Sequence, residues 1–161
     1  MRKAFKIIGI CILLCLIIQT VRMYSSGNNI QEYTYLALDN SNHTNNELPK
    51  SPIIFVYFST ECGFCEKTII ELSKLHNVNR TINFVFITRE TDIVVVKKFV
   101  VENKMDELTS FIYIDPKDNF PMDFGLGMTY STPTILVYNN KGKFVKEVKN
   151  YKDIIYLKSD I

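Results

Sequence analysis

Short apolar runs separated by polar segments recur from residue 53 onward. They lie at 53–58, 84–87, 111–114, 134–138 and 144–148, and they are rich in β-branched and aromatic residues. Runs of this length and composition, bounded by turn residues, are typical of strands buried in a sheet. The last two flank the turn residues Asn139, Asn140 and Gly142, so we expect them to form a β-hairpin.

Two segments between these runs have helical periodicity instead. After the first run, the residues Cys65, Ile69, Leu72, Leu75 and His76 follow helical spacing. Thr60 is the expected N-cap of this helix.

The segment 91–105 contains a β-branched stretch, but Ile93, Val96 and Val100 fit one helical face, with Lys97 and Lys98 outside, and we predict a helix. Residues 119–127 are expected to form a short helix or loop, and 150–161 are too short for a prediction.

The order of these elements predicts the fold class. Strands alternate with helices and the chain ends in a hairpin, which is typical of an α/β fold with a central mixed, largely parallel sheet flanked by helices. We assign this domain to residues 51–161. Residues 24–50 are rich in Asn, Ser and Thr and indicate a polar linker, with one possible extra strand at 31–38.

The first 23 residues have the layout of a targeting segment. Arg2, Lys3 and Lys6 precede an unbroken apolar run at 7–18, which indicates a cleaved signal peptide or a retained membrane anchor. The run is short for a membrane span, and small residues at 25–27 offer no strong cleavage site, so both alternatives stay open. Either would place the rest of the chain outside the cytoplasm, because the positive residues remain inside.

Composition and charge exclude several classes of protein. The chain has 161 residues, 47% of them hydrophobic, which excludes a disordered protein. Of its 19 basic residues, four precede Met23, so the remaining 15 face 17 acidic residues. No basic surface is implied and we expect no nucleic-acid partner. The four cysteines are too few for a disulfide-rich scaffold.

The candidate chemistry lies at Cys62 and Cys65, between the first strand and the first helix. A sulfur at a helix N-terminus faces unpaired N–H groups and the positive end of the helix dipole, which favour the nucleophilic thiolate. We therefore expect Cys62 to attack a disulfide and Cys65, one turn further in, to resolve the intermediate. A second signal is Pro133, directly before a strand, where proline indicates a strand start or a cis turn.

Together these residues resemble the thioredoxin superfamily, on the stretch from Phe58 to Cys65, on Thr132 and Pro133, and on Lys141 to Lys143. The resemblance implies a thioredoxin-like fold in which Pro133 is cis and packs beside the cysteines. It also implies that Thr132 pairs with the substrate backbone, next to Gly63 and Phe64. The extra strand and helix before Pro133 are similar to the redoxin branch, which includes extracytoplasmic, membrane-tethered thiol–disulfide oxidoreductases.

Three positions depart from the pattern that the resemblance implies. Glu61 stands where a tryptophan is usual, and Val56 stands near the position of the buried acid of thioredoxins. Thr68 stands where some redoxin reductases have a glutamate. Cys65 therefore lacks the acids that the family uses for proton transfer.

We expect an extracytoplasmic enzyme that reduces protein disulfides through the Cys62–Cys65 pair. Alternatives are a disulfide isomerase or oxidase, a fixed disulfide, and a copper-delivery protein of the same fold, although the copper-binding spacing and distal histidine are missing. We expect no cofactor and no metal ion. The expected partners are protein thiol or disulfide substrates, a redox partner, and the membrane if the N-terminal segment is retained. The expected state is a monomer.

Overall fold

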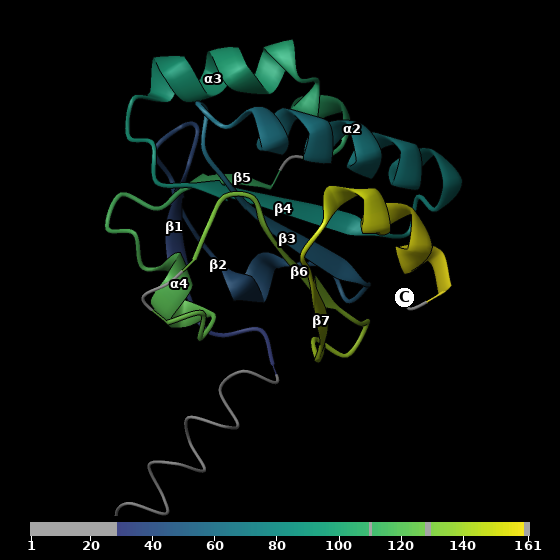
Figure 1. Cartoon of the computed structure of the whole chain (residues 1–161). Helices are drawn as coiled ribbons and strands as arrows, with labels where there is room; N and C mark the ends of the chain where they lie inside the picture. Colours follow the sequence, from purple (N-terminus) through teal and green to yellow (C-terminus); the bar gives the residue numbers. More distant parts are fainter. Residues whose placement is uncertain (1–28, 110, 128–129, 160–161) are drawn as a thin grey trace, which may run out of the picture.

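The computed structural model describes residues 29–109, 111–127 and 130–159, which form one sheet covered by helices on both faces (Figure 1). The sheet has seven strands in the order β2-β1-β5-β4-β3-β6-β7. In chain order the strands are β1 (Thr34–Ala37), β2 (Asn42–Thr44), β3 (Ile53–Phe58), β4 (Asn83–Thr88), β5 (Ile112–Ile114), β6 (Thr134–Tyr138) and β7 (Phe144–Val148).

The sheet is mixed, and its parallel part is restricted to the centre. β3 pairs in parallel with β4, and β4 with β5. The pairs β1–β2, β1–β5, β3–β6 and β6–β7 are antiparallel. The parallel share is smaller than the alternation of strands and helices suggested. A helix crossover separates β3 from β4, as a parallel pair requires, but β6 runs against β3 and a second hairpin joins β5.

That second hairpin comes from the segment for which the sequence indicated a polar linker. Residues 34–37 of β1 lie within the possible strand at 31–38, and β2 pairs with β1 through Thr34 and Thr44. Leu36 and Ala37 of β1 pair in turn with Ile114 and Tyr113 of β5. The expected targeting segment, residues 1–23, lies outside the described residues. Within the described ranges, no helix has the length and hydropathy needed to cross a bilayer.

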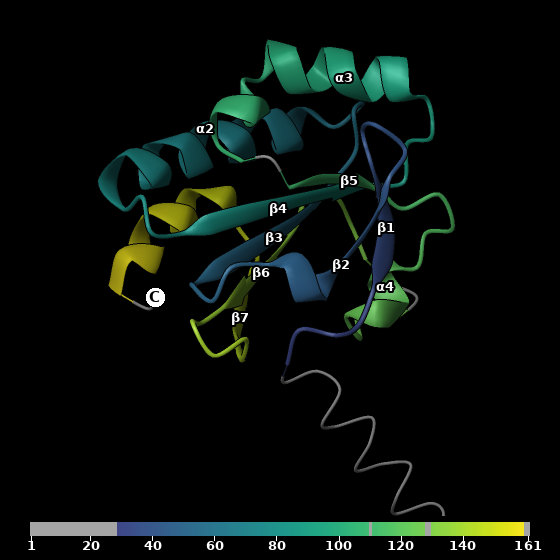
Figure 2. The same ribbon diagram turned by 180° about the vertical axis from the view of Figure 1, so that it is seen from behind.

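Helices cover the sheet unequally (Figures 1 and 2). On one face lie α2 (Gly63–Val78), α3 (Ile93–Glu102) and the C-terminal 3₁₀ helix η3 (Tyr151–Ser159). On the other lies α4 (Phe120–Asp123); the short 3₁₀ helices η1 (Asn45–Glu47) and η2 (Met105–Glu107) follow β2 and α3. The predicted helix at 91–105 is confirmed as α3, with the side chain of Asp92 capping its N-terminus. η3 lies in the segment 150–161, for which no element was predicted, and buries Ile154 and Leu157 on the α2 side of the sheet.

Alternation along β3 divides the core into two layers. All six residues of β3 are buried, as expected for a strand covered on both faces. Ile54, Val56 and Phe58 belong to the cluster beneath α2 and α3, and Ile53, Phe55 and Tyr57 belong to the cluster on the α4 face. β3 is thus held by packing on both faces, and the short segment that follows it leads to Cys62 at the start of α2.

Candidate active site at Cys62 and Cys65

Cys62 is the N-cap of α2. Its backbone is extended, and its Sγ accepts a hydrogen bond from the backbone N–H of Cys65 at 3.2 Å. The prediction that Thr60 caps this helix is wrong, because a turn in which Cys62 N–H bonds to the carbonyl of Ser59 carries the chain two residues further before the helix begins. The sulfur itself therefore meets the unpaired N–H groups and the positive end of the helix dipole, which stabilise a thiolate.

Cys65 lies one helical turn further and is buried, whereas Cys62 is partly accessible; both are free thiols. Burial raises the pKa of the Cys65 thiol to about 12, and a hydrogen bond with Cys62 adds to this rise, while the backbone of Ser59 and the side chain of Thr132 oppose it. The Cys65 thiol therefore stays protonated in the reduced protein. Cys62 is thus the more accessible of the two sulfurs.

The Thr132–Pro133 peptide bond is cis, as the resemblance implied. The Cys62 thiol donates a hydrogen bond to the carbonyl of Thr132 at 3.5 Å, so this loop lies directly beside the cysteine pair. Gly63 and Phe64 lie on the open side: a Cβ added at Gly63 would meet no atom within 4 Å, and the Phe64 side chain is 61% exposed. All the residues predicted for the site therefore lie near the C-terminal end of β3 and the N-terminal end of β6.

Val56 and Thr68 stand at the two positions where the resemblance implied an acid near Cys65. Val56 is fully buried in the same cluster as Cys65. Thr68, one turn along α2, is also fully buried, and its hydroxyl has no hydrogen-bond partner. Val56 and Thr68, two of the three departures from the thioredoxin pattern, are thus buried and carry no acid.

A network around Asp118 supports the loop that leads to Pro133. The Asp118 carboxylate accepts hydrogen bonds from the hydroxyls of Tyr57 and of Tyr130, the latter at 2.5 Å, and Arg89 lies 3.7 Å away. Partial burial acts against ionisation, but the two hydroxyls and the arginine lower the pKa of Asp118 overall. Asp118 is not among the residues expected from the sequence, and its backbone has a positive φ of 54° that few residues other than glycine adopt.

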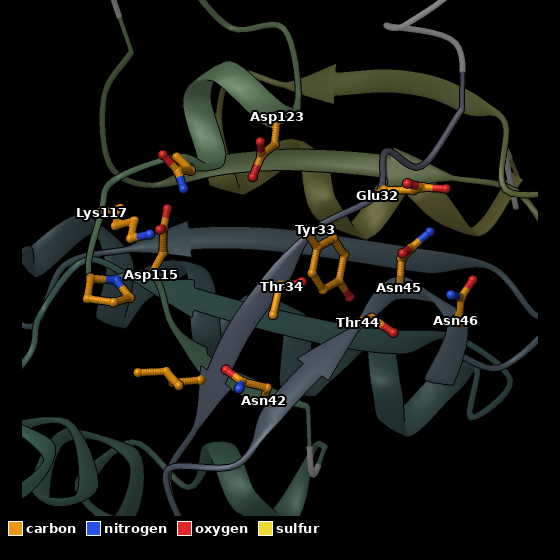
Figure 3. A pocket seen from close by; sticks show the side chains of 13 residues that line it. Glu32, Tyr33, Thr34, Asn42, Thr44, Asn45, Asn46, Asp115, Lys117 and Asp123 are labelled. Atoms are coloured by element: carbon orange, nitrogen blue, oxygen red, sulfur yellow. The ribbon is translucent and has the colours of Figure 1, made fainter.

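Two hollows flank this part of the molecule. A groove of about 490 Å³ begins at Thr132 and Pro133 and continues past Phe64 to Tyr151 and Lys152. A larger hollow of about 640 Å³ lies on the side of the β1–β2 hairpin, between this hairpin and the loop after β5 (Figure 3). Glu32, Asp115 and Asp123 line it together with several asparagines. It contains no cysteine, and among the described residues no group of His, Cys, Asp and Glu side chains is arranged to hold a metal ion.

Comparisons with known proteins agree with this geometry. The redoxin family matches residues 25–154. No curated protein matches the chain in sequence.

Solved structures share the fold at low sequence identity. The thioredoxin domain of a Bacteroides vulgatus thiol–disulfide oxidoreductase is 17% identical and superimposes with a TM-score of 0.68, covering 83% of this chain and 95% of that one. A secreted Mycobacterium tuberculosis disulfide oxidoreductase, described as homologous to Escherichia coli DsbE, is 17% identical with a TM-score of 0.65, covering 80% and 96%. A putative DsbE of Chlorobium tepidum is 14% identical with a TM-score of 0.68, covering 83% and 92%.

The family match spans most of the chain and includes both cysteines and Pro133. The fold, the cis-proline and the paired thiols at the start of α2 agree with it. The chain therefore belongs to the redoxin family of the thioredoxin superfamily and is a thiol–disulfide oxidoreductase.

Proposed function

We propose that this protein reduces disulfide bonds of partner proteins outside the cytoplasm, with Cys62 as the attacking and Cys65 as the resolving thiol. The observation that carries the proposal is the unequal exposure of two neighbouring thiols. Cys62 is accessible at the N-terminus of α2, and Cys65 is 1% exposed directly behind it. A partner disulfide can reach the first sulfur but not the second.

The reaction transfers two electrons from the cysteine pair to the partner. The Cys62 thiolate attacks one sulfur of the partner disulfide, so that an intermolecular S–S bond forms and the other partner sulfur leaves as a thiolate that takes up a proton. Cys65 then loses its proton and attacks Cys62. The Cys62–Cys65 disulfide forms, and the second partner sulfur leaves as a thiol. The partner is reduced and the enzyme oxidised, and a separate redox partner must restore the two thiols.

The cis-proline loop is proposed to hold the partner chain. The Thr132 carbonyl already lies 3.5 Å from Cys62 Sγ, so a partner backbone aligned along Thr132 would bring its own sulfur to Cys62. Gly63 leaves room above the helix start, and Phe64 offers an exposed ring beside Pro133. These four residues are the proposed substrate contacts.

The residues between the two cysteines and the burial of Cys65 support reduction of the partner disulfide over oxidation of partner thiols. Strongly oxidising members of the superfamily are oxidising because their reduced, thiolate form is stabilised. Here neither Gly63 nor Phe64 provides a cation or an imidazole, and burial raises the pKa of Cys65 to about 12. Little therefore stabilises the reduced form beyond the helix N-terminus, and the disulfide of the enzyme is comparatively favourable.

The proposed location rests on the N-terminal sequence. Arg2, Lys3 and Lys6 followed by an apolar run fit a signal peptide or anchor, and disulfide chemistry belongs in extracytoplasmic compartments. The Mycobacterium tuberculosis relative is described as secreted, which agrees with this proposal.

Substitution of each cysteine tests the mechanism. We expect Cys62→Ser to abolish the reduction of insulin disulfides, and Cys65→Ala to accumulate mixed disulfides with partner proteins, whose identification would name the substrates. Reduction that survives in Cys62→Ser would contradict the proposal. A measured reduction potential of about −120 mV, as in strongly oxidising members of the superfamily, instead of about −270 mV, as in thioredoxin, would favour the oxidase alternative. Copper titration of the reduced protein tests the metal-delivery alternative.

A further inference from the structure

The groove beside the cysteine pair has a chemical character of its own. It starts at Thr132 and Pro133, next to Cys62, and ends at Tyr151 and Lys152, where β7 leads into η3. Its volume of about 490 Å³ and its open shape suit an extended chain segment. A partner chain aligned along Thr132 would therefore lie next to this groove.

Aromatic side chains form one part of this groove. Phe64 is 61% exposed, its ring centroid lies 6.4 Å from that of Tyr151, and both residues line the groove together with Pro133. A large apolar side chain with this exposure, next to a reactive thiol, is typical of a contact surface for a partner.

Lysines form the other part. Lys149 and Lys152 line the groove, and the Nζ of Lys67 lies 5.3 Å from the centroid of the Phe64 ring, at the cation–π distance. All three lysines are exposed, and Lys149 pairs with Glu147 at 2.6 Å, so its charge is partly balanced.

The described residues that line the groove include no acidic side chain. The exposed Glu61 and Glu66 flank the cysteines in sequence but do not line the groove. The positive charge along this wall is therefore not cancelled from within it.

We propose that the groove selects partner proteins whose reactive cysteine is flanked by acidic residues. This inference rests on the proposed function and adds the class of substrate. The partner segment would place a carboxylate near Lys152 and Lys67 and an apolar side chain against Phe64 and Tyr151. Charge complementarity of this kind acts mainly on the rate of encounter and on partner choice.

Three peptides test the proposal with the reduced full-length chain. Each contains one disulfide, and they differ only in the flanking residues, which are glutamate, glutamine or lysine. Because each exposed charge pair contributes a few-fold at most, we expect kcat/KM at low salt to be about tenfold higher for the glutamate peptide than for the lysine peptide. The preference should shrink in high salt, where charges are screened beyond about 3 Å.

A charge reversal locates the effect. Lys152→Glu should bring the ratio between the glutamate and lysine peptides to about one or below it. The matched control is Lys141→Glu, which makes the same change at an exposed position in the β6–β7 turn, at the other end of β6 from Pro133. We expect this variant to keep the wild-type ratio.

The outcomes separate this inference from the proposed function. Equal reduction of the three peptides by the wild type, or an equal effect of Lys141→Glu and Lys152→Glu, would overturn the acidic preference while the reductase activity stands. Failure to reduce any of the three peptides would overturn the proposed function itself.

Discussion

Beneath α2, α3 and η3, the core consists of aliphatic and phenyl side chains around the thiol of Cys65, whereas the core on the α4 face is built largely from tyrosine and phenylalanine rings. On the α4 face, the hydroxyls of Tyr35 and Tyr57 donate hydrogen bonds to Asp123 and Asp118. Asp115, the buried carboxylate of the described chain, lies on this side as well, where burial raises its pKa and the N–H of Phe120 bonds to it.

The two faces of the sheet therefore differ in function: one holds the redox thiols, and the other holds hydrogen-bonded carboxylates. The face that holds the redox thiols provides a dry, apolar environment, which keeps Cys65 protonated. On the opposite face, the carboxylates of Asp115, Asp118 and Asp123 accept hydrogen bonds from a backbone N–H or from tyrosine hydroxyls. Because burial raises the pKa of Cys65, its thiol must lose a proton before it can attack Cys62.

The largest expected effect that follows from this contrast is on the pH dependence of the resolving step. With a Cys65 pKa of about 12, the fraction of thiolate rises about tenfold per pH unit through the neutral and mildly alkaline range. The reduced protein is mixed with the disulfide of nitrothiobenzoate, and the release of nitrothiobenzoate is followed by stopped flow. The second release comes from the attack of Cys65 on the mixed disulfide and does not depend on reagent concentration. We expect its rate to rise about tenfold per pH unit from about pH 6 to 9. Cys65→Ala should lack this phase.

A plateau of that rate below about pH 9 would contradict this prediction, because it would require another group to remove the proton.

The raised pKa of Cys65 also affects the stability of the fold. A thiol whose pKa is raised in the folded protein stabilises the fold below the ordinary thiol pKa, and this contribution is lost as the pH rises towards 12. The reduced protein should therefore lose stability in strong alkali.

The next largest effect is a loss of stability on substitution of Asp118 on the α4 face. Asp118→Asn removes the charge that accepts hydrogen bonds from Tyr57 and Tyr130. Hydrogen bonds to a charged group contribute about 1.5–3 kcal/mol, but Asp118 is 36% exposed and solvent screens it, so we expect the free energy of unfolding to fall by about 1 kcal/mol at neutral pH. Urea unfolding measures it, and Asp106→Asn is the exposed control.

The pH dependence of this loss has a defined sign. Because the pKa of Asp118 is lowered in the folded protein, its stabilising effect is present above the ordinary carboxyl pKa and disappears as the pH falls through the folded value. Wild type and Asp118→Asn should therefore converge in acid. A constant difference down to about pH 2 would show that the effect comes from packing and not from the charge.

The smallest expected effect tests the unpartnered hydroxyl on the α2 face. Thr68→Val removes a buried hydroxyl that has no hydrogen-bond partner, so the free energy of unfolding should stay the same or rise by up to about 1 kcal/mol. Thr134→Val is the matched control, since its hydroxyl donates to the carbonyl of Ser131 at 2.6 Å, and it should lose about 1 kcal/mol. A marked destabilisation by Thr68→Val would indicate that its hydroxyl has a partner in solution, such as an ordered water.

The two faces also differ in how much of their structure could be predicted from the sequence. The elements beneath α2 and α3 follow from local patterns, because buried strands and amphipathic helices leave a periodic hydrophobic signal. Cys62, Cys65 and Pro133 were found because their chemistry is carried by residue type and spacing. The cap of α2 was misassigned to Thr60, since threonine and a thiol at Cys62 both suit an N-cap and only the turn at Ser59 decides between them.

Other features depend on contacts that no local pattern contains. β2 is three polar residues long and has no periodicity to detect. The Asp118 network joins side chains that are far apart in the chain, from the end of β3 and from the loop before Pro133. The number of parallel strand pairs also depends on where in the sheet each strand is inserted, and this is a property of the whole sheet.

The position of the β1–β2 hairpin has a consequence for solubility during and after folding. Without residues 34–44, β5 would be an edge strand, and its three buried residues would offer unpaired backbone groups to any other extended chain. With the hairpin in place, the exposed edges are β2, which is short and polar, and β7, which carries Lys146 and Glu147 and shifts register near Tyr138. Short, charged and irregular edges are poor templates for foreign strands. The hairpin thus covers an apolar strand of the sheet that would otherwise favour aggregation.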